Sequence, residues 1–292
     1  MRKIGALEAG GTKMVLAVYT EEGQELDRLT LPTLMPEETL PQMAGYFREA
    51  GIDALGVGSF GPLCLDPASP EYGYITTTPK PGWKNAPLLP TLLEGLDIPA
   101  AIDTDVNAAA IAEYEQGAAR GADCLVYVTV GTGIGGGALV NGQPVHGLLH
   151  PEMGHMLLRP LTEDPLPDGV CPYHKGCLEG LASGPALAAR SDGKAKDLPD
   201  DHPLFRLEAD YLAQMCHNLL MILSPKKIIL GGGVMTRSSL LEQVRRRTGE
   251  LLGDYLASPE ARTGECIVLP ELFPVSGLVG AYELGKRALL RK

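Results

Sequence analysis

The run K-I-G-A-L-E-A-G-G-T-K-M-V-L-A-V-Y, residues 3–19, is the stretch that decides the fold. Apolar residues that favour strands stand on both sides of the glycine turn E-A-G-G-T-K at 8–13, so the run reads as strand, turn and strand. The same order returns at 124–140, where C-L-V-Y-V-T-V is followed by G-T-G-I-G-G-G and A-L-V. Two copies about 120 residues apart predict two related α/β halves.

The rest of the chain divides between these two halves. The first half adds strands at 54–60 and 99–105 and an Ala-rich helix that closes on Gly117. The second half adds a strand and three helices, predicted at 227–230, 208–223, 238–256 and 277–290. We therefore place an N-terminal lobe at 1–115 and a C-terminal lobe at 116–292, and leave open whether the last helix packs back on the N-terminal lobe.

Composition and charge limit the partners. A chain of 292 residues with 45% hydrophobic and 21% charged residues fits a globular protein of two lobes. Its 25 Lys and Arg against 36 Asp and Glu give a net charge of −11, which argues against nucleic acid and anionic membrane surfaces as partners. The N-terminus lacks the apolar core of a signal peptide, and no apolar run reaches the length of a spanning helix. We expect a cytoplasmic protein.

Two segments, H-P-E-M-G-H at 150–155 and C-P-Y-H-K-G-C at 171–177, gather nitrogen and sulfur donors of the kind that close a tetrahedral zinc site. The four candidate ligands are His155, Cys171, His174 and Cys177. Four protein donors leave no open position for water, so the metal would be structural. The alternative is a pair of buried thiols with two surface histidines. Scattered cysteines in a cytosolic chain favour a metal over a disulfide framework.

The glycine turns suit phosphate binding, but not in the two commonest ways. G-T-G-I-G-G at 131–136 matches the spacing of the dinucleotide fingerprint, yet it leads into a strand, whereas that fingerprint must open a helix. No Walker A loop is present. Glycines still let backbone N–H groups approach an anion, and Thr12 and Thr132 add hydroxyl donors. A third glycine turn at 231–233 strengthens the nucleotide interpretation over ordinary glycine-rich hairpins.

Asp105 is the candidate general base. It stands at a strand-to-helix junction in D-T-D-V-N-A-A-A, where a carboxylate can accept a proton from a substrate hydroxyl. Phosphoryl transfer needs little more than such an acceptor, positioning, and charge neutralisation by Mg²⁺. Capping of the helix is the alternative role for Asp105, and Asp103 is a rival acid two residues earlier.

These motifs together resemble the ROK family of sugar kinases and related repressors, within the actin-like ATPase superfamily, and are most similar to its bacterial fructokinases. The resemblance covers essentially the whole chain and rests on E-A-G-G-T-K, G-S-F-G-P, T-D-V-N-A-A-A, G-T-G-I-G-G-G, H-P-E-M-G-H, the 171–185 segment and L-G-G-G-V. It implies an α/β actin-like ATPase (ribonuclease H-like) two-lobe fold with a bound structural zinc loop. It also implies ATP with Mg²⁺, a hexose, and a homodimer.

The resemblance further assigns roles to individual residues. Asp105 would be the catalytic base, the four donors named above would bind structural zinc, and Glu152 and Glu179 would bind sugar hydroxyls beside that zinc. The second phosphate loop would span Gly131 to Gly135. The expected ATP-binding residues are Gly10, Gly11, Thr12, Lys13, Thr132, Gly133, Pro185, Gly232, Gly233, Val234, Met235 and Thr236.

Three departures from the family pattern bear on these roles. Glu8 stands where the family usually has Asp, which affects how Mg²⁺ is organised. The metal loop differs from the common C-x-C-G-x-x-G-C form because His174 replaces a cysteine and the second donor is shifted. Thr104 replaces the Asn that precedes the catalytic Asp in glucose-type members, so we include Thr104 among the substrate-binding residues and favour fructose over glucose.

The predicted activity is therefore transfer of the γ-phosphoryl of ATP to D-fructose, giving fructose 6-phosphate. One alternative is a broader hexokinase acting on mannose, glucose or an N-acetyl hexosamine. Another is a sugar-sensing regulator, but regulators of the family carry an N-terminal helix-turn-helix, whereas this chain reaches its first glycine turn by residue 10.

Overall fold

The computed structural model describes residues 1–291, which form two compact units. Unit 1 comprises Met1–Glu115, Pro144–His150 and the chain from Pro274 onward; unit 2 comprises Gln116–Gln143 and Pro151–Phe273. The sequence analysis divided the chain once, between residues 115 and 116. The contacts also give unit 1 the short segment 144–150 and the C-terminal helix, whose packing the sequence left open.

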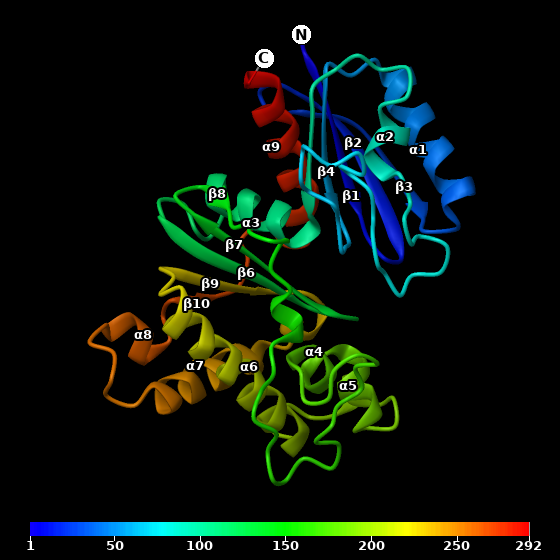
Figure 1. The fold of residues 1–292 in the computed structure, drawn as a ribbon. Coiled ribbons are helices and arrows are strands. Elements are labelled where there is room, and N and C mark those ends of the chain that lie inside the picture. The colour runs from blue at the N-terminus through cyan, green and yellow to red at the C-terminus, as the bar shows by residue number, and fades with distance from the viewer. Residues whose placement is uncertain (292) are drawn as a thin grey trace. The chain divides into compact units, whose positions relative to one another are not determined.

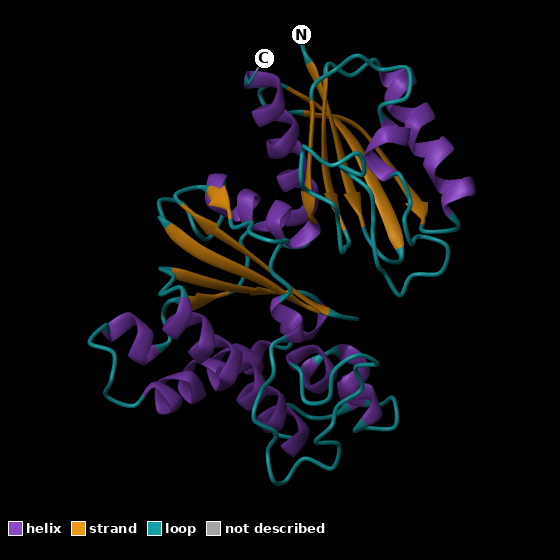
Figure 2. Cartoon of the chain, in the orientation of Figure 1, coloured by secondary structure: helices purple, strands orange, loops and turns teal. Residues whose placement is uncertain are grey.

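Unit 1 is a five-stranded sheet in the order β3-β2-β1-β4-β5 with helices on its faces (Figures 1 and 2). Strand β1 pairs antiparallel with β2 and parallel with β4, which pairs parallel with β5. The elements are β1 (Lys3–Ala9), β2 (Lys13–Thr20), β3 (Glu25–Pro32), α1 (Pro36–Ala50), β4 (Ala54–Ser59), α2 (Leu88–Leu92), β5 (Ala100–Thr104), α3 (Asp105–Glu115) and α9 (Ser276–Leu290).

Alternation along β1 and β2 divides the apolar residues of unit 1 between two cores. Leu7 and Leu16 point to one face, where they pack in the core that contains Phe47 of α1 and Trp83. Ile4 and its neighbours two residues apart point to the opposite face, where they pack against α9. Burying one such side chain contributes about 1.5–3 kcal/mol, so the period of two in these strands fixes which face each helix covers.

Glycines allow α9 to lie against its neighbours at backbone distance. A Cβ placed on Gly56 of β4 would stand 1.9 Å from the carbonyl oxygen of Ala281 in α9. A Cβ on Gly280 of α9 would stand 1.8 Å from the carbonyl oxygen of Ala108 in α3. Since real Cβ atoms do not approach so closely, only glycine fits at these two positions.

The second sheet has the order β10-β9-β6-β7-β8 and repeats the connectivity of the first. The antiparallel hairpin β6–β7 corresponds to β1–β2, and β9 lies parallel to β6 as β4 does to β1. The two related halves predicted from the repeated strand–turn–strand pattern are therefore confirmed. The elements are β6 (Cys124–Val130), β7 (Ile134–Val140), β8 (Gln143–Pro144), η1 (Met153–His155), α4 (Leu178–Ala182), α5 (Gly184–Ala189), η2 (Ala195–Asp197), α6 (Pro203–Ile222), β9 (Lys227–Gly231), η3 (Gly233–Thr236), α7 (Ser238–Leu252), α8 (Pro259–Thr263) and β10 (Ile267–Val268).

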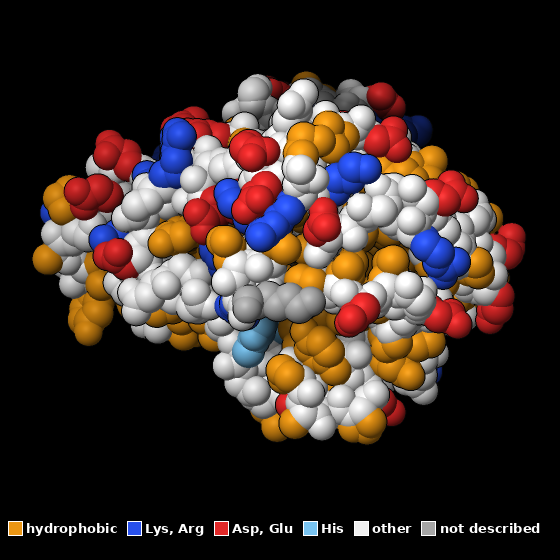
Figure 3. Space-filling model, turned by 90° about the horizontal axis from the view of Figure 1, so that it is seen from above, with side chains coloured by type: hydrophobic (Ala, Val, Ile, Leu, Met, Phe, Trp, Pro, Cys, Tyr) orange, Lys and Arg blue, Asp and Glu red, His pale blue; other side chains and the backbone are white. Residues whose placement is uncertain are grey.

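The surface carries side chains of both charges, as expected from the composition of the chain. On the face shown in Figure 3, acidic and basic side chains are interspersed, as the 36 acidic and 25 basic residues of the chain require. Among residues 1–291, no helix is both long enough and apolar enough to cross a bilayer.

We predict that Gly280→Ala destabilises unit 1 by about 3 kcal/mol, because its methyl group would overlap the Ala108 backbone. Denaturant unfolding measures the effect. Gly45→Ala is the matched control: Gly45 also lies inside a helix, α1, but a Cβ there meets nothing within 4 Å. That variant should be stabilised by about 0.5–1 kcal/mol. Equal responses of the two variants would contradict the close approach of α9 and α3.

Candidate functional site

The parallel strands of unit 1 bring two predicted site segments to one edge of the sheet. Ala9 at the end of β1 is in register with Ser59 of β4, and Ser59 is in register with Thr104 of β5. The glycine turn after β1 and Asp105 after β5 therefore leave the sheet two strand spacings apart, about 10 Å. Ligands of α/β sheets bind outside the carboxyl ends of parallel strands, which is where both segments stand.

The first glycine turn, Gly10 to Lys13, is held by its own backbone and by Thr33, the residue that follows β3. Gly10 N donates to Lys13 O at 2.9 Å, and a Cβ on Gly10 would stand 2.9 Å from that oxygen. Thr33 makes two hydrogen bonds to the turn: its N–H donates to Thr12 O, and its hydroxyl donates to Gly10 O at 2.7 Å. Thr12 and Lys13 are exposed, so their side chains are accessible to a ligand.

Glu8, the residue that departs from the family pattern, faces α9. Its carboxyl group is so close to the first turn of α9 that a Cβ on Gly277 would stand 2.6 Å from Glu8 Oε1. Burial raises the pKa of Glu8, while the positive charges of Lys13 and Arg28 act in the opposite direction. The longer side chain of Glu8 is thus accommodated because position 277 is glycine.

Three polar residues singled out from the sequence, Asp103, Thr104 and Asp105, lie at the junction between β5 and α3. They differ in burial and in hydrogen bonding. The Asp103 carboxylate is 3% exposed and accepts hydrogen bonds from Thr104 N at 2.8 Å and Asn107 Nδ2 at 2.7 Å. The Thr104 hydroxyl is also buried and accepts from Asn107 N at 3.1 Å. This is the bond of a helix cap, so Thr104 takes the capping role that was weighed for Asp105.

Asp105 itself is the first residue of α3 and is half-buried. Its Oδ1 accepts from Val106 N at 2.9 Å, a bond that satisfies one of the amides at the start of the helix. Asp103 is committed to a buried network, whereas Asp105 is partly accessible to solvent. Accessibility therefore favours Asp105 over Asp103 as the group that meets a substrate hydroxyl.

In unit 2 the second glycine turn is tied to Glu179. Glu179 Oε2 accepts from Ile134 N at 2.9 Å, and a Cβ on Gly133 would stand 2.7 Å from the same oxygen. Gly131 N also donates to Gly133 O at 2.9 Å. Glu179, predicted to bind a sugar hydroxyl, thus also fixes the turn that carries Thr132.

The other predicted nucleotide segments converge on this turn. Gly184 N, next to Pro185 at the start of α5, donates to Gly131 O at 2.7 Å. Gly232, with a φ of +90°, lies against Val130: a Cβ there would stand 2.4 Å from the Val130 carbonyl oxygen. Within η3, the Thr236 hydroxyl donates to Gly233 O at 2.7 Å. Unit 2 therefore assembles the 131–133 turn, Pro185 and Gly232–Thr236 at one end of β6 and β9.

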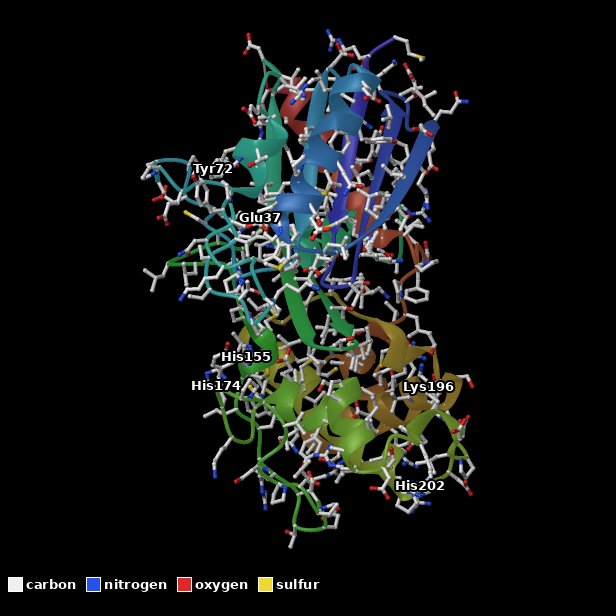
Figure 4. All side chains as sticks on the ribbon, turned by 90° about the vertical axis from the view of Figure 1, so that its right-hand side faces the viewer. Glu37, Tyr72, His155, His174, Lys196 and His202 are labelled. Carbon is white, nitrogen blue, oxygen red and sulfur yellow. The ribbon has the colours of Figure 1, made fainter. Side chains whose placement is uncertain are left out.

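The four predicted metal ligands also meet within unit 2. The donor atoms of His155, Cys171, His174 and Cys177 all lie within 4.8 Å of one another. Cys171 Sγ is 3.9 Å from Nδ1 of His155 and of His174, and Cys177 Sγ is 3.8 Å from His155 Nδ1. Figure 4 shows the two histidines side by side, with ring centroids 4.9 Å apart. This clustering favours a metal site over the alternative of unrelated thiols and surface histidines.

A buried ion pair that the sequence analysis missed anchors the loop between these ligands. Asp164 and Arg190 have side chains that are 0% and 2% exposed, and the Arg190 guanidinium donates to both Asp164 oxygens, at 2.8 and 2.7 Å. The Tyr211 hydroxyl of α6 donates to the same carboxylate at 2.6 Å. Burial would raise the pKa of Asp164, but the bonds from Arg190 and Tyr211 outweigh it and lower the pKa. A basic residue at the C-terminal end of α5 and a tyrosine in α6 carry no sequence signal that pairs them with a loop aspartate.

Glu152, the last predicted sugar ligand, immediately precedes η1 and is exposed. Because η1 ends on His155, the cluster of metal donors fixes the short helix that follows Glu152. A ligand at the cluster would therefore restrict Glu152 as well.

The chain is similar to known proteins over nearly its whole length. Residues 4–288 match the ROK family. The chain belongs to the ROK family. The family resemblance expected from the sequence motifs, and the mixed α/β fold with two sheets, are thereby confirmed.

Individual ROK relatives cover nearly the full length of the chain. The fructokinase of Pediococcus pentosaceus is 43% identical over 286 residues, 98% of this chain and 98% of its own. The fructokinase of Zymomonas mobilis is 43% identical over 292 residues, 97% of this chain and 96% of its own. Among solved structures, a ROK family glucokinase from Streptomyces griseus in complex with glucose and AMPPNP superimposes with a TM-score of 0.76 at 25% identity, covering 98% of this chain and 99% of that one.

Proposed function

We propose that the protein is an ATP-dependent fructokinase that converts D-fructose to fructose 6-phosphate. The observation that carries the proposal is 43% identity over almost the whole chain to two ROK fructokinases. The glucokinase neighbour, at 25% identity, is more distant. The replacement of Asn by Thr104, whose hydroxyl already caps α3, removes an amide that a glucose-type site would offer to the sugar.

In the proposed reaction, the Asp105 carboxylate accepts the proton of the fructose 6-hydroxyl as that oxygen attacks the γ-phosphorus of MgATP. The new O–P bond forms while the bond from the γ-phosphorus to the bridging oxygen breaks, and ADP leaves with those electrons. This transfer relies on positioning and charge neutralisation more than on covalent chemistry.

Both units contain residues to which we assign roles in this reaction. Unit 1 would contribute Asp105 and the turn Gly10 to Lys13, whose backbone amides suit phosphate oxygens. Unit 2 would contribute the 131–135 turn, Pro185 and Gly232–Thr236 to the nucleotide, and Glu152 and Glu179 to sugar hydroxyls. The convergence of the unit 2 segments supports their common assignment to one ligand. By family resemblance, we further propose a cytoplasmic homodimer.

Two alternatives make different predictions. A broader hexokinase would act on glucose, mannose or an N-acetyl hexosamine, and the similarity to a glucokinase structure favours testing it. A sugar-sensing regulator would bind a sugar and DNA without turnover. The net charge of −11 and the aspartate at a strand-to-helix junction favour an enzyme over such a regulator.

A sugar panel tests the substrate directly. With ATP and Mg²⁺, release of ADP should be fastest with fructose, and kcat/KM for fructose should exceed that for glucose by at least about tenfold, the effect of one well-placed hydrogen bond. Mannose and N-acetylmannosamine complete the panel. Equal kcat/KM on glucose would refute the fructose assignment, and no turnover on any hexose would refute the kinase.

Asp105→Asn should reduce kcat for fructose by about 10²–10⁴-fold, because an amide cannot accept the proton. The dissociation constant for ATP, measured by calorimetry, should stay within about twofold, since Asp105 is assigned to the sugar hydroxyl. Asp66→Asn is a control of the same chemistry at an exposed loop aspartate of unit 1. Turnover by Asp105→Asn at the wild-type rate would remove the residue from the proposed role.

We also propose that the four-donor cluster binds zinc structurally. A tetrahedral zinc with Zn–S of about 2.3 Å and Zn–N of about 2.0 Å sets adjacent N and S donors about 3.6 Å apart. The observed separations of 3.8–3.9 Å fit that geometry. Burial raises the pKa of the Cys177 thiol to about 11, so binding would have to displace a proton that the buried sulfur otherwise retains. Four protein donors complete a structural site.

Purified protein should contain one zinc per chain by elemental analysis, and Cys171→Ala should lose it. The midpoint of thermal unfolding should fall in the same variant, because metal binding stabilises the folded state. Cys64→Ala is the control: Cys64 is a half-buried free cysteine of unit 1, outside the cluster. Equal zinc content in the two variants would contradict the assignment.

A further inference from the structure

The segment 144–150 belongs to unit 1 although the neighbouring residues on both sides belong to unit 2. Two histidines attach it. His146 Nε2 lies 3.2 Å from Asp103 Oδ1 and 3.1 Å from Oδ2, and His150 Nε2 accepts from Leu63 N at 3.0 Å. The two rings therefore use the same nitrogen in opposite ways: Nε2 of His146 donates, and Nε2 of His150 accepts.

The contact of His146 completes the hydrogen bonding of a buried charge. Asp103 is 3% exposed, and its other donors are Thr104 N and Asn107 Nδ2, both from the β5–α3 junction. Asn107 Nδ2 also lies 3.5 Å from His146 Nε2, so the three side chains meet at one point. Of the three donors, only His146 can carry a positive charge to balance the carboxylate.

Along the chain, this network lies on both sides of the proposed base, Asp105. Asp103 is the penultimate residue of β5, and Asn107 lies in the first turn of α3. Their hydrogen bond therefore joins the strand to the helix across the segment that contains Asp105. A shift of the Asp103 carboxylate would therefore move the start of α3. A displacement of about 1 Å at a catalytic group is enough to slow a reaction about a hundredfold.

We propose that His146 is a positioning residue for phosphoryl transfer: by donating to Asp103 it fixes the β5–α3 junction and thereby the direction of the Asp105 carboxylate. The inference rests on the proposed role of Asp105. His146 acts through Asp103 and is not assigned a contact with sugar or nucleotide.

The electrostatics of the junction agree with this role. The hydrogen bond with Asp103 raises the pKa of His146 above its ordinary value, against the effect of burial. The ion pair is therefore complete below the ordinary pKa of histidine and is lost as pH rises through the raised value. One further titratable group interacts with the pair: Tyr72, whose pKa is raised first by burial and then by the Asp103 charge.

Three variants test the proposal on the full-length protein. His146→Ala removes the donor, and His146→Gln restores a neutral N–H donor on a side chain of similar reach. His217→Ala is the matched control, because His217 is a half-buried histidine of α6 whose ring nitrogen lies 3.3 Å from Asn218 Oδ1. For each variant we would measure kcat, KM for ATP, KM for fructose and the unfolding midpoint.

His146→Ala should lower kcat at least about tenfold while KM for ATP stays within about twofold, since the nucleotide groups are untouched. His146→Gln should recover most of the lost kcat, and His217→Ala should match the wild type. A purely structural role would instead lower stability without separating kcat from KM. Wild-type kcat in His146→Ala, or a His146→Gln protein as slow as the alanine variant, would overturn the proposal. If the alanine variant fails to fold, His146→Gln alone decides between these outcomes.

A spectroscopic measurement keeps this inference separate from the proposed activity. The imidazole Cε1–H resonance of His146, followed by NMR against pH, should report a pKa above the ordinary value of about 6.5. In Asp103→Asn the pKa should fall back toward that value, because the partner charge is gone. An unshifted His146 in the wild type would overturn the contact itself. Failure of the wild type to phosphorylate any hexose would instead refute the proposed function and leave this titration result standing.

Discussion

Parallel strands end at one edge of a sheet, and this constraint decides where chemistry can occur in both units. In unit 1 it brings the turn after β1 and the residue after β5 to the same edge. In unit 2 it brings the 131–133 turn after β6 and the 232–236 segment after β9 together, although about 100 residues separate them. The repeated connectivity thus produces two sheet edges of similar design.

Buried carboxylates hold the irregular segments that these edges carry. Asp103 accepts three hydrogen bonds, one of them from His146. Asp164 accepts four, two of them from Arg190. Taking a carboxylate out of water costs several kcal/mol, so such a residue persists only where its partners are geometrically fixed. Both networks therefore confer order: the first on the junction that carries Asp105, the second on the loop between the metal donors.

Local sequence patterns predicted the helices, strands and turns, whereas contacts between residues far apart in the sequence were not predicted. The glycine turns and their strands followed from alternation, and the clustering of the four candidate metal donors from residue type and spacing. The helix predicted to start at residue 208 begins earlier, at Pro203, with His202 as its cap. A proline at the first helical position is a start signal that the sequence contains, but the prediction followed the stripe of apolar residues instead. The pairing of His146 with Asp103 joins residues 43 positions apart and depends on tertiary structure alone.

The order of synthesis gives α9 a particular importance. One face of the first sheet, with Ile4, Ala6 and Val15, is covered by a helix made from the last residues of the chain. During synthesis α9 emerges after unit 2, which ends at Phe273. The Ile4 face of the first sheet therefore lacks its covering helix until α9 has been made, and uncovered apolar surface of this kind promotes aggregation.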